Sequence, residues 1–490
     1  MEMYKKSISE LSDLLNKKSV SSLEMTKYFI DRIHSYDSKL NSFITVNEKL
    51  AIEQAKKADS LIAKKNNSFL TGIPIAHKDL FSTKGLLTTC ASKMLENYIP
   101  PFNATVVEKL NDVGMVNLGK TNMDEFAMGS SNESSYFGAV KNPWNIKKVP
   151  GGSSGGSASA VAARLVPIAT GSDTGGSIRQ PASFCGLTGL KPTYGSVSRY
   201  GMIAYASSLD QGGPIGKSAE DCLHIYNEMK GYDVNDPTSN KKISQVKERL
   251  KCTKENAKNI SIGLPKEYFS ENLDKNITTC INKAIEVFKN LGFNFKEVSL
   301  PDHSYTIPAY YIIASAEASS NLSRYDGIKF GYRCNNPESL QDLYLKTRKE
   351  GFGKEVKKRI MIGAYALSSG YYDEYYMRAL KIRRIIRDNF LQAFNDVDYI
   401  FSPTSPSTAF GLGEKTSNAL DMYLSDIYTT SVNLSGLPAA SIPVGFANNL
   451  PVGMQIIGNY FSDDNILDIA SLFQAETDWH TRIPGEFDNE

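Results

Sequence analysis

Glycine is concentrated in one stretch of this chain, and that density limits what the stretch can form. Ten of the 36 glycines fall between Gly151 and Gly195. Glycine loses more conformational freedom on folding than any other residue, so this density argues against long helices or strands. Apolar runs interrupt the stretch, which argues against a flexible linker. We therefore expect short, closely packed elements, namely a small-residue helix over 158–165 and a strand over 166–170, with glycines at the turns between them.

Helix and strand patterns alternate along the rest of the chain. Residues from 1 to about 65 are predicted to be helical, with a capping box at Ser21–Glu24 and a second helix over 48–63. Short apolar runs predict strands over 72–78, 115–118, 260–264, 294–298, 399–402, 440–444 and 453–457. Further helices are expected over 277–291 and through most of 305–394. This alternation predicts an α/β fold in which helices cover both faces of a sheet, and strands near both ends favour a single domain over 1–490.

Charge and cysteine content argue against several classes of function. The 55 basic and 53 acidic residues leave a net charge of +2, which does not support nucleic-acid binding by bulk charge. The six cysteines are scattered without a CxxC pair, so neither a zinc site nor a disulfide framework is expected, and a reducing compartment is favoured. The N-terminus shows no apolar leader, and no apolar run is long enough to span a bilayer. We expect a cytoplasmic protein with no metal and no membrane span.

The second half of the glycine-rich stretch suits a nucleophilic serine. Gly175 and Gly176 precede Ser177, after the predicted strand and before a turn. Glycines at such a turn let several backbone N–H groups point at one place, where they can stabilise an oxyanion. Removing one such donor costs roughly 3 kcal/mol of transition-state stabilisation. The pattern therefore favours Ser177 as a nucleophile.

A serine nucleophile needs a base, and none of the five histidines stands in an unusual context. A lysine can take this role when it is buried, because the loss of hydration lowers its pKa toward neutrality. Lys78 ends the apolar strand predicted over 72–78. From the local sequence alone, a partly exposed lysine at the end of a strand is the simpler interpretation. The base is therefore undecided at this level.

Two other glycine-containing motifs fit less well. Residues 151–155 match the G-x-S-x-G elbow of α/β-hydrolases, but no downstream Asp and His stand out to complete that triad. Residues 213–218 are similar to the end of a phosphate-binding loop, but Gln211 occupies the position of its first glycine. A purely structural turn is the remaining alternative for residues 151–156.

Three separated segments together carry a resemblance to a known family. Residues 72–79 (GIPIAHKD), 151–157 (GGSSGGS) and 171–183 (GSDTGGSIRQPAS) resemble, in this order, the amidase signature family. The resemblance extends over nearly the whole chain. It implies a large mixed sheet between helical layers, with a catalytic core over about 70–215.

The same resemblance implies a catalytic triad without histidine. Ser177 would be the nucleophile, Ser153, held at a cis peptide bond, would relay its proton, and Lys78 would be the base, neutral in the resting enzyme. An oxyanion hole would be formed by the backbone N–H groups of Thr174, Gly175, Gly176 and Ser177.

Within the family, the chain is most similar to the A subunits of tRNA-dependent amidotransferases. Long matches carry this similarity, at residues 118–138, 207–221, 315–333, 355–376 and 433–445. It implies that the protein hydrolyses glutamine and supplies ammonia to partner B and C subunits in a heterotrimer. There, ATP and Mg²⁺ would be used to amidate mischarged Glu-tRNA(Gln), or Asp-tRNA(Asn). No cofactor is implied for this chain itself.

Glutamine as substrate implies a role for three distant residues. Its α-carboxylate suits a guanidinium and its α-ammonium suits a carboxylate. Arg359 and Asp426 match the family positions for these two contacts, and Tyr310 matches a hydroxyl contact. From local sequence alone, Arg359 and Asp426 would be interpreted as charged residues on helix surfaces, and Tyr310 as a packed aromatic residue. The adjacent Lys358 and Tyr311 leave the register of two of these assignments open.

Two other functions are weighed against this one. The first is a stand-alone amidase that acts on a small or lipid amide, although a lipid-amide hydrolase would be expected to show an apolar anchor or cap. The second is a non-catalytic assembly subunit, which the presence of Ser177, Ser153 and Lys78 argues against.

Overall fold

The computed structural model describes residues 2–245, 251–269, 273–300, 303–416 and 418–489. Within these residues, eleven strands form one sheet in the order β1-β3-β2-β4-β6-β5-β10-β11-β9-β7-β8. The strands are β1 Phe43–Val46, β2 Pro74–Lys78, β3 Val116–Thr121, β4 Ile168–Asp173, β5 Thr188–Lys191, β6 Gln211–Gly216, β7 Ser261–Pro265, β8 Asn294–Val298, β9 Tyr399–Pro403, β10 Ala439–Ala447 and β11 Leu450–Gly458. This single sheet supports the proposal of one domain over 1–490.

The sheet is mixed, as the family resemblance implies. β2 runs parallel to β3 and β4, and β7 runs parallel to β8 and β9. The centre, from β4 through β6, β5, β10 and β11 to β9, is antiparallel. Every residue of β2, β4, β5, β6 and β11 is buried, whereas the edge strands β1 and β8 are largely accessible. Strands buried on both faces need helices above and below them.

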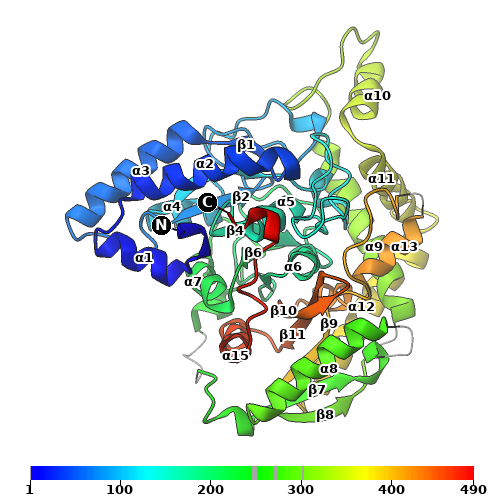
Figure 1. Cartoon of the computed structure of the whole chain (residues 1–490). Helices are drawn as coiled ribbons and strands as arrows, with labels where there is room; N and C mark the ends of the chain where they lie inside the picture. Colours follow the sequence, from blue (N-terminus) through cyan, green and yellow to red (C-terminus); the bar gives the residue numbers. More distant parts are fainter. Residues whose placement is uncertain (1, 246–250, 270–272, 301–302, 417, 490) are drawn as a thin grey trace.

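Helices supply that cover on both faces (Figure 1). They are α1 Ile8–Asn16, α2 Ser22–Leu40, α3 Glu48–Ala63, α4 Thr105–Asp112, α5 Gly155–Ala162, α6 Arg179–Cys185, α7 Ala219–Met229, α8 Lys275–Asn290, α9 His303–Asn321, α10 Leu340–Gly351, α11 Lys354–Ala366, α12 Arg378–Ala393, α13 Ala419–Tyr423, α14 Thr430–Ser435 and α15 Asp463–Ala475. α6 packs against β5, β10 and β11, and α7, α8 and α15 pack against the same part of the sheet from the other side. The predicted α/β fold is confirmed.

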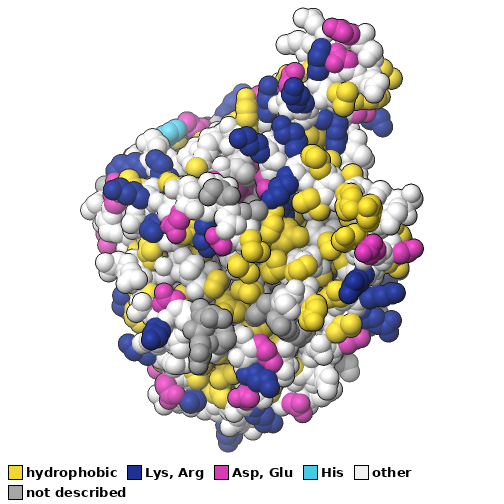
Figure 2. Space-filling view, turned by 90° about the vertical axis from the view of Figure 1, so that its right-hand side faces the viewer, with side chains coloured by type: hydrophobic (Ala, Val, Ile, Leu, Met, Phe, Trp, Pro, Cys, Tyr) yellow, Lys and Arg dark blue, Asp and Glu magenta, His cyan; other side chains and the backbone are white. Residues whose placement is uncertain are grey.

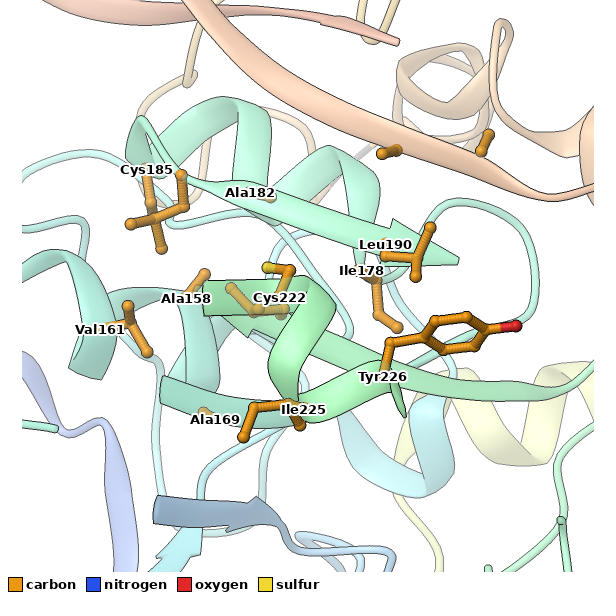
Figure 3. Packing of buried hydrophobic residues seen from close by; sticks show 14 of the residues in the cluster. Ala158, Val161, Ala169, Ile178, Ala182, Cys185, Leu190, Cys222, Ile225 and Tyr226 are labelled. Carbon is orange, nitrogen blue, oxygen red and sulfur yellow. The ribbon is translucent and has the colours of Figure 1, made fainter. Parts of the chain in front are cut away.

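The core is continuous around the glycine-rich stretch. Figure 3 shows part of it, where Val161 of α5, Ala182 of α6 and Ile225 of α7 pack with Ala169 of β4 and with β5. Except for Tyr226 of α7, the side chains labelled in Figure 3 are small or branched. Among the described residues, no helix has both the length and the apolar composition that a membrane span requires.

Several predicted boundaries differ from the observed ones. The helix predicted over 158–165 is α5 Gly155–Ala162, and it includes Gly156, where a Cβ would lie 2.2 Å from the Asn122 carbonyl oxygen. The strand predicted over 166–170 is β4 Ile168–Asp173, and it includes Gly171, where a Cβ would lie 2.9 Å from the Ile178 side chain. These glycines permit contact inside elements and do not mark turns, so the turn prediction was wrong for them.

The helical prediction for residues 1 to about 65 is wrong at Phe43–Val46, because these residues pair with β3 as strand β1. Three other local predictions are confirmed. Ser21 and Glu24 form the reciprocal capping box that starts α2. The second N-terminal helix is Glu48–Ala63, as predicted. Residues 213–216, which imitate a phosphate-binding loop, are part of β6, and a Cβ on Gly213 would lie 2.1 Å from the Leu190 carbonyl oxygen. Their glycines therefore serve sheet packing, and the rejection of a nucleotide loop is correct.

Candidate active site

The side chain of Lys78 lies at the centre of the site. Lys78 is the last residue of β2 and is fully buried, so the interpretation as a partly exposed strand-end lysine is wrong. Its Nζ contacts three serine hydroxyls, at 2.8 Å for Ser153, 2.9 Å for Ser154 and 2.9 Å for Ser172. No carboxylate is among these hydrogen-bond partners in the described part of the chain. The lysine is thus held by neutral groups that can give and accept protons.

This environment changes the ionisation of Lys78. Burial lowers the pKa of Lys78 to about 7, because the charged ammonium loses its hydration. The carboxylates of Asp124 and Asp173 oppose this shift only in part. Near neutral pH a large fraction of the side chain is therefore an uncharged amine, which can accept a proton.

The backbone around Ser153 is fixed from several sides. The peptide bond between Gly152 and Ser153 is cis, as the family resemblance implies. The Gly152 N–H donates to Gln180 Oε1 at 3.0 Å, and the Ser153 carbonyl accepts from the Asp124 N–H at 3.2 Å. A Cβ on Gly152 would lie 2.1 Å from Asp124 Oδ2, so only glycine fits there. This backbone aims the Ser153 hydroxyl at Lys78.

Ser177 lies in the turn between β4 and α6, and its carbonyl accepts the Ser154 N–H at 3.1 Å. Asp173 organises this turn by accepting the N–H groups of Gly176 at 2.8 Å and Ile178 at 3.2 Å. Burial by itself would raise the pKa of Asp173. The attraction of the Arg179 guanidinium, 3.0 Å away, outweighs this effect, so the pKa of Asp173 is lowered to about 2. The turn is therefore built around a buried ion pair.

The predicted oxyanion donors differ in their hydrogen bonding. The Gly176 N–H already donates to Asp173, so it is not free in this structure. In the described part of the chain, the amides of Thr174, Gly175 and Ser177 show no acceptor. The Gly175 carbonyl accepts from Thr429 Oγ1 at 2.6 Å, and Thr174 Oγ1 donates to Asp210 at 2.6 Å. The amides of Thr174, Gly175 and Ser177 are thus available to an oxyanion, and their assignment stays a prediction.

Arg359 is buried on α11 and does not lie on the helix surface. Its Nε donates to Glu355 at 2.8 Å, and its Nη1 donates to the Tyr205 hydroxyl. The Tyr311 and Tyr423 rings lie 5.0 Å and 5.9 Å from the guanidinium carbon. Nη2 shows no partner among the described residues. One edge of the guanidinium is therefore left for an anionic group.

The neighbouring Lys358 has a different role, which bears on the register left open by the sequence. Lys358 is only half-buried, and its Nζ donates to the Tyr423 hydroxyl at 3.0 Å. Tyr423 in turn stacks on Tyr311 with ring centroids 3.7 Å apart. Tyr311 and Tyr423 therefore flank the guanidinium of Arg359, whereas Lys358 binds only the hydroxyl end of Tyr423.

Asp426 and Tyr310 are the other two residues predicted to bind the substrate, and both are buried. Ser130 Oγ donates to Asp426 Oδ2. Oδ1 has no hydrogen-bond partner in the described residues, and burial raises the pKa of Asp426 to about 7. A Cβ on Gly175 would lie 2.6 Å from the Tyr310 hydroxyl oxygen. Tyr310 thus joins the substrate region to the turn that bears Ser177.

A cavity of about 480 Å³ lies beside Arg359, and neither Lys78 nor Asp426 is among the described residues that line it. Its walls include Ser130, Ser131, Glu355 and Arg359. A larger cavity of about 860 Å³ lies elsewhere and is lined by none of the predicted site residues, so its size does not make it the reaction site. Among the described residues, no group of three or more His, Cys, Asp or Glu side chains is placed to hold a metal ion.

Sequence reasoning missed several residues of the site. Ser154 and Ser172 contact the Lys78 amine, and Ser130 and Tyr205 hold the two predicted substrate-binding charges. Ser154 and Ser172 stand inside the quoted motifs, so their proximity to Ser153 and Ser177 was a usable signal. Tyr205 offered none, because only the fold brings it to Arg359.

Comparison with known proteins shows to which family the chain is similar. The model of the family described as Amidase matches residues 24–467. The A subunit of the glutamyl-tRNA(Gln) amidotransferase of Marinomonas sp. (strain MWYL1) is 58% identical over 98% of this chain and 99% of its own length. The crystal structure of the corresponding A subunit from Thermotoga maritima has 39% identity and a TM-score of 0.80, covering 99% of this chain and 98% of that one. Native peptide amidase from Stenotrophomonas maltophilia has 26% identity and a TM-score of 0.81, covering 99% of both chains.

Proposed function

Because this chain belongs to the amidase family, we propose that it is the glutamine-hydrolysing subunit of a tRNA-dependent amidotransferase. Relatives that carry this name match it over nearly their whole length. The observation that carries the proposal is that the turn bearing Ser177 joins the two groups of residues. On one side its Ser177 carbonyl accepts the N–H of Ser154, whose hydroxyl contacts Lys78. On the other side Thr429 Oγ1 donates to the carbonyls of both Gly175 and Asp426. Such a site offers amide chemistry at one end and amino-acid recognition at the other.

The proposed reaction uses Lys78, Ser153 and Ser177 in sequence. The neutral Lys78 amine accepts the proton of Ser153, which accepts that of Ser177, and Ser177 Oγ forms a bond to the amide carbon of glutamine. The N–H groups of Gly175 and Ser177 stabilise the resulting oxyanion. The C–N bond then breaks, the proton returns through Ser153 to the leaving nitrogen, and ammonia departs. Water hydrolyses the glutamyl ester by the same route and gives glutamate.

Glutamine recognition is assigned to the three substrate residues. The free edge of the Arg359 guanidinium fits the α-carboxylate, and the unpartnered Oδ1 of Asp426 fits the α-ammonium. An ammonium placed there would lower the pKa of Asp426 and make it a carboxylate, since an opposite charge favours the ionised form. The Tyr310 hydroxyl, beside Gly175, would contact the substrate between its two ends.

The partners follow from the same assignment. The ammonia would pass to partner B and C subunits, in which ATP and Mg²⁺ drive amidation of Glu-tRNA(Gln), or of Asp-tRNA(Asn), in the cytoplasm. Relatives described as A subunits support the existence of partner chains. Exposed apolar side chains, among them Met361, Tyr365 and Tyr375, also support it. Hydrophobic side chains gather on one face of the molecule (Figure 2). Partner identity is tested by co-purification with this chain.

Arg359→Ala is expected to raise the KM for glutamine by at least about 100-fold, since a charge-assisted contact to the α-carboxylate is lost. The KM for free ammonia in the partner-dependent amidation should stay within twofold. Steady-state assays of the assembled enzyme with each nitrogen donor measure both values. Arg384→Ala removes an exposed guanidinium and serves as the control. Equal increases in the KM for glutamine and the KM for ammonia would show that Arg359 does not bind the glutamine substrate.

Tyr205→Phe is expected to raise the KM for glutamine about tenfold with kcat within twofold, because Arg359 loses the hydroxyl that orients it. The KM and kcat for glutamine hydrolysis measure this effect. Tyr4→Phe removes a hydroxyl that bonds Asp488 at the chain ends, and should change neither constant. A fall in kcat at unchanged KM would contradict the positioning role of Tyr205.

The alternative of a stand-alone amidase has a specific observation in its favour. Peptide amidase shares this fold at a TM-score of 0.81, so the fold does not separate the two functions. Ammonia release from glutamine and from simple amides, measured with and without partner subunits and charged tRNA, distinguishes them. Full activity on simple amides by the isolated chain would favour the stand-alone enzyme. Stimulation of glutamine hydrolysis by the partners would favour the amidotransferase.

A further inference from the structure

The buried side chain of Gln180 joins two parts of the site that are distant in sequence. Gln180 lies in the first turn of α6, just after Ser177. Its Oε1 accepts the Gly152 N–H at 3.0 Å, and its Nε2 donates to the Ser130 carbonyl at 2.8 Å. Its own N–H donates to the Gly176 carbonyl at 2.8 Å. One amide group therefore connects the nucleophile turn, the loop of Ser153 and the loop of Ser130.

The Oε1 end of the Gln180 side chain contacts the loop that carries the proposed relay serine, Ser153. Gly152 provides the carbonyl side of the peptide bond to Ser153, whose hydroxyl lies 2.8 Å from the Lys78 amine. The space around the bridge is tight, since a Cβ on Gly151 would lie 2.4 Å from Gln180 Oε1. The position of the Ser153 hydroxyl therefore depends on the acceptor that Gln180 presents.

The Nε2 end of the Gln180 side chain contacts Ser130, which bonds Asp426 in the proposed α-ammonium site. Ser130 borders the substrate cavity, and its hydroxyl donates to Asp426 Oδ2. The carbonyl of the same residue accepts the Gln180 amide. Ser130 is thus held through its carbonyl by Gln180 and in turn holds Asp426 through its hydroxyl.

We propose that Gln180 is a positioning residue that keeps the relay serine Ser153 and the substrate-binding pair Ser130–Asp426 in one rigid frame. This proposal rests on the proposed function of the site. A buried N–H or carbonyl left without a partner is costly, so both loops shift when the bridge is lost. Because a displacement of about 1 Å can cost 100-fold in rate, such shifts reduce both proton transfer and glutamine binding.

Two substitutions separate the two ends of the bridge. Gln180→Glu keeps an oxygen that accepts from Gly152, but its carboxylate offers no proton to the Ser130 carbonyl. Gln180→Met removes both contacts with little change in volume. The matched control is Gln474→Met, because Gln474 is also a buried bridging amide, which accepts from the Ala219 N–H at 2.8 Å and donates to Thr188 at 2.9 Å.

The experiment uses the chain assembled with its partner subunits. The rate at which a fluorophosphonate labels Ser177 reports the relay, and the glutamine concentration that halves this rate reports substrate binding. The values of kcat and KM for glutamine hydrolysis accompany both. Thermal unfolding of each variant shows whether the fold is retained.

Gln180→Met is expected to slow labelling at least tenfold and to raise the protecting glutamine concentration by about tenfold. Gln180→Glu should raise that concentration similarly but keep the labelling rate within about threefold. Gln474→Met should change neither quantity. Both quantities within twofold of wild type in both Gln180 variants would overturn the proposal, as would equal changes in Gln474→Met. A wild-type chain that is not labelled at Ser177 would instead overturn the proposed function, and the inference with it.

Discussion

Replacing Ser177 with alanine is expected to stop ammonia release from glutamine, with a fall in kcat on the order of 10⁴-fold or more. The nucleophile and its proton relay act as a unit, so losing one member costs nearly as much as losing all of them. The backbone amides of the turn would still bind an oxyanion, but no acyl ester could form. Ammonia release from glutamine by the assembled enzyme measures this effect.

The same Ser177→Ala variant should still support amidation of mischarged tRNA when ammonium salts replace glutamine. The partner site needs only ammonia, and Ser177 makes no side-chain hydrogen bond in the described structure that would hold the fold. Ser196→Ala is the control, since its hydroxyl donates to the Thr193 carbonyl at 2.7 Å. Loss of the ammonium-dependent reaction as well would show that Ser177 is needed for the fold or the assembly.

Replacing Lys78 with methionine is expected to lower kcat for glutamine by about 10²- to 10⁴-fold, the range typical of a lost general base. Methionine is similar in length and apolar, so it fills the buried site without an unpaired charge. The KM should change little, because Lys78 contacts the serines and not the cavity walls that bind the amino acid. A variant with normal kcat would exclude Lys78 as the base.

The pH dependence of wild-type glutamine hydrolysis provides the second test of Lys78. Only the neutral amine accepts a proton, and the pKa of Lys78 is lowered to about 7 by burial. The rate of glutamine hydrolysis should therefore be low below about pH 7, where the amine is protonated. It should rise through that pH and level off above it. A profile of kcat/KM against pH measures this rise. A rate that falls through the same range would contradict the proposed base.

The chain offers a matched control for this profile. Burial also lowers the pKa of Lys191 to about 7, and its Nζ donates to the Pro192 carbonyl at 2.8 Å. Lys191→Met removes a buried lysine of similar pKa that contacts none of the serines of the site. Its pH profile should match that of the wild type. If kcat/KM of the Lys191→Met variant no longer rises near neutral pH, the group that controls this rise is Lys191 and not Lys78.

Much of the fold was predictable because apolar periodicity and caps are local properties. The capping box at Ser21–Glu24 and the helix over 48–63 need only neighbouring residues, and both are found where predicted. Strands near both ends of the chain also pointed to one shared sheet. The glycines were harder, because Gly156 and Gly171 serve contacts with backbone and side chains from other segments.

The sequence by itself determined the candidate residues of the triad, since the segments around Lys78, Ser153 and Ser177 carry local patterns that resemble a family. It did not determine the ionisation of Lys78, because a pKa near 7 depends on burial by strands and loops that are distant in sequence. Only the tertiary structure decided this, by closing the sheet and helices around an amine that meets three hydroxyls and no carboxylate among its described hydrogen-bond partners. Burial depends on every packed neighbour at once, and no local motif encodes it.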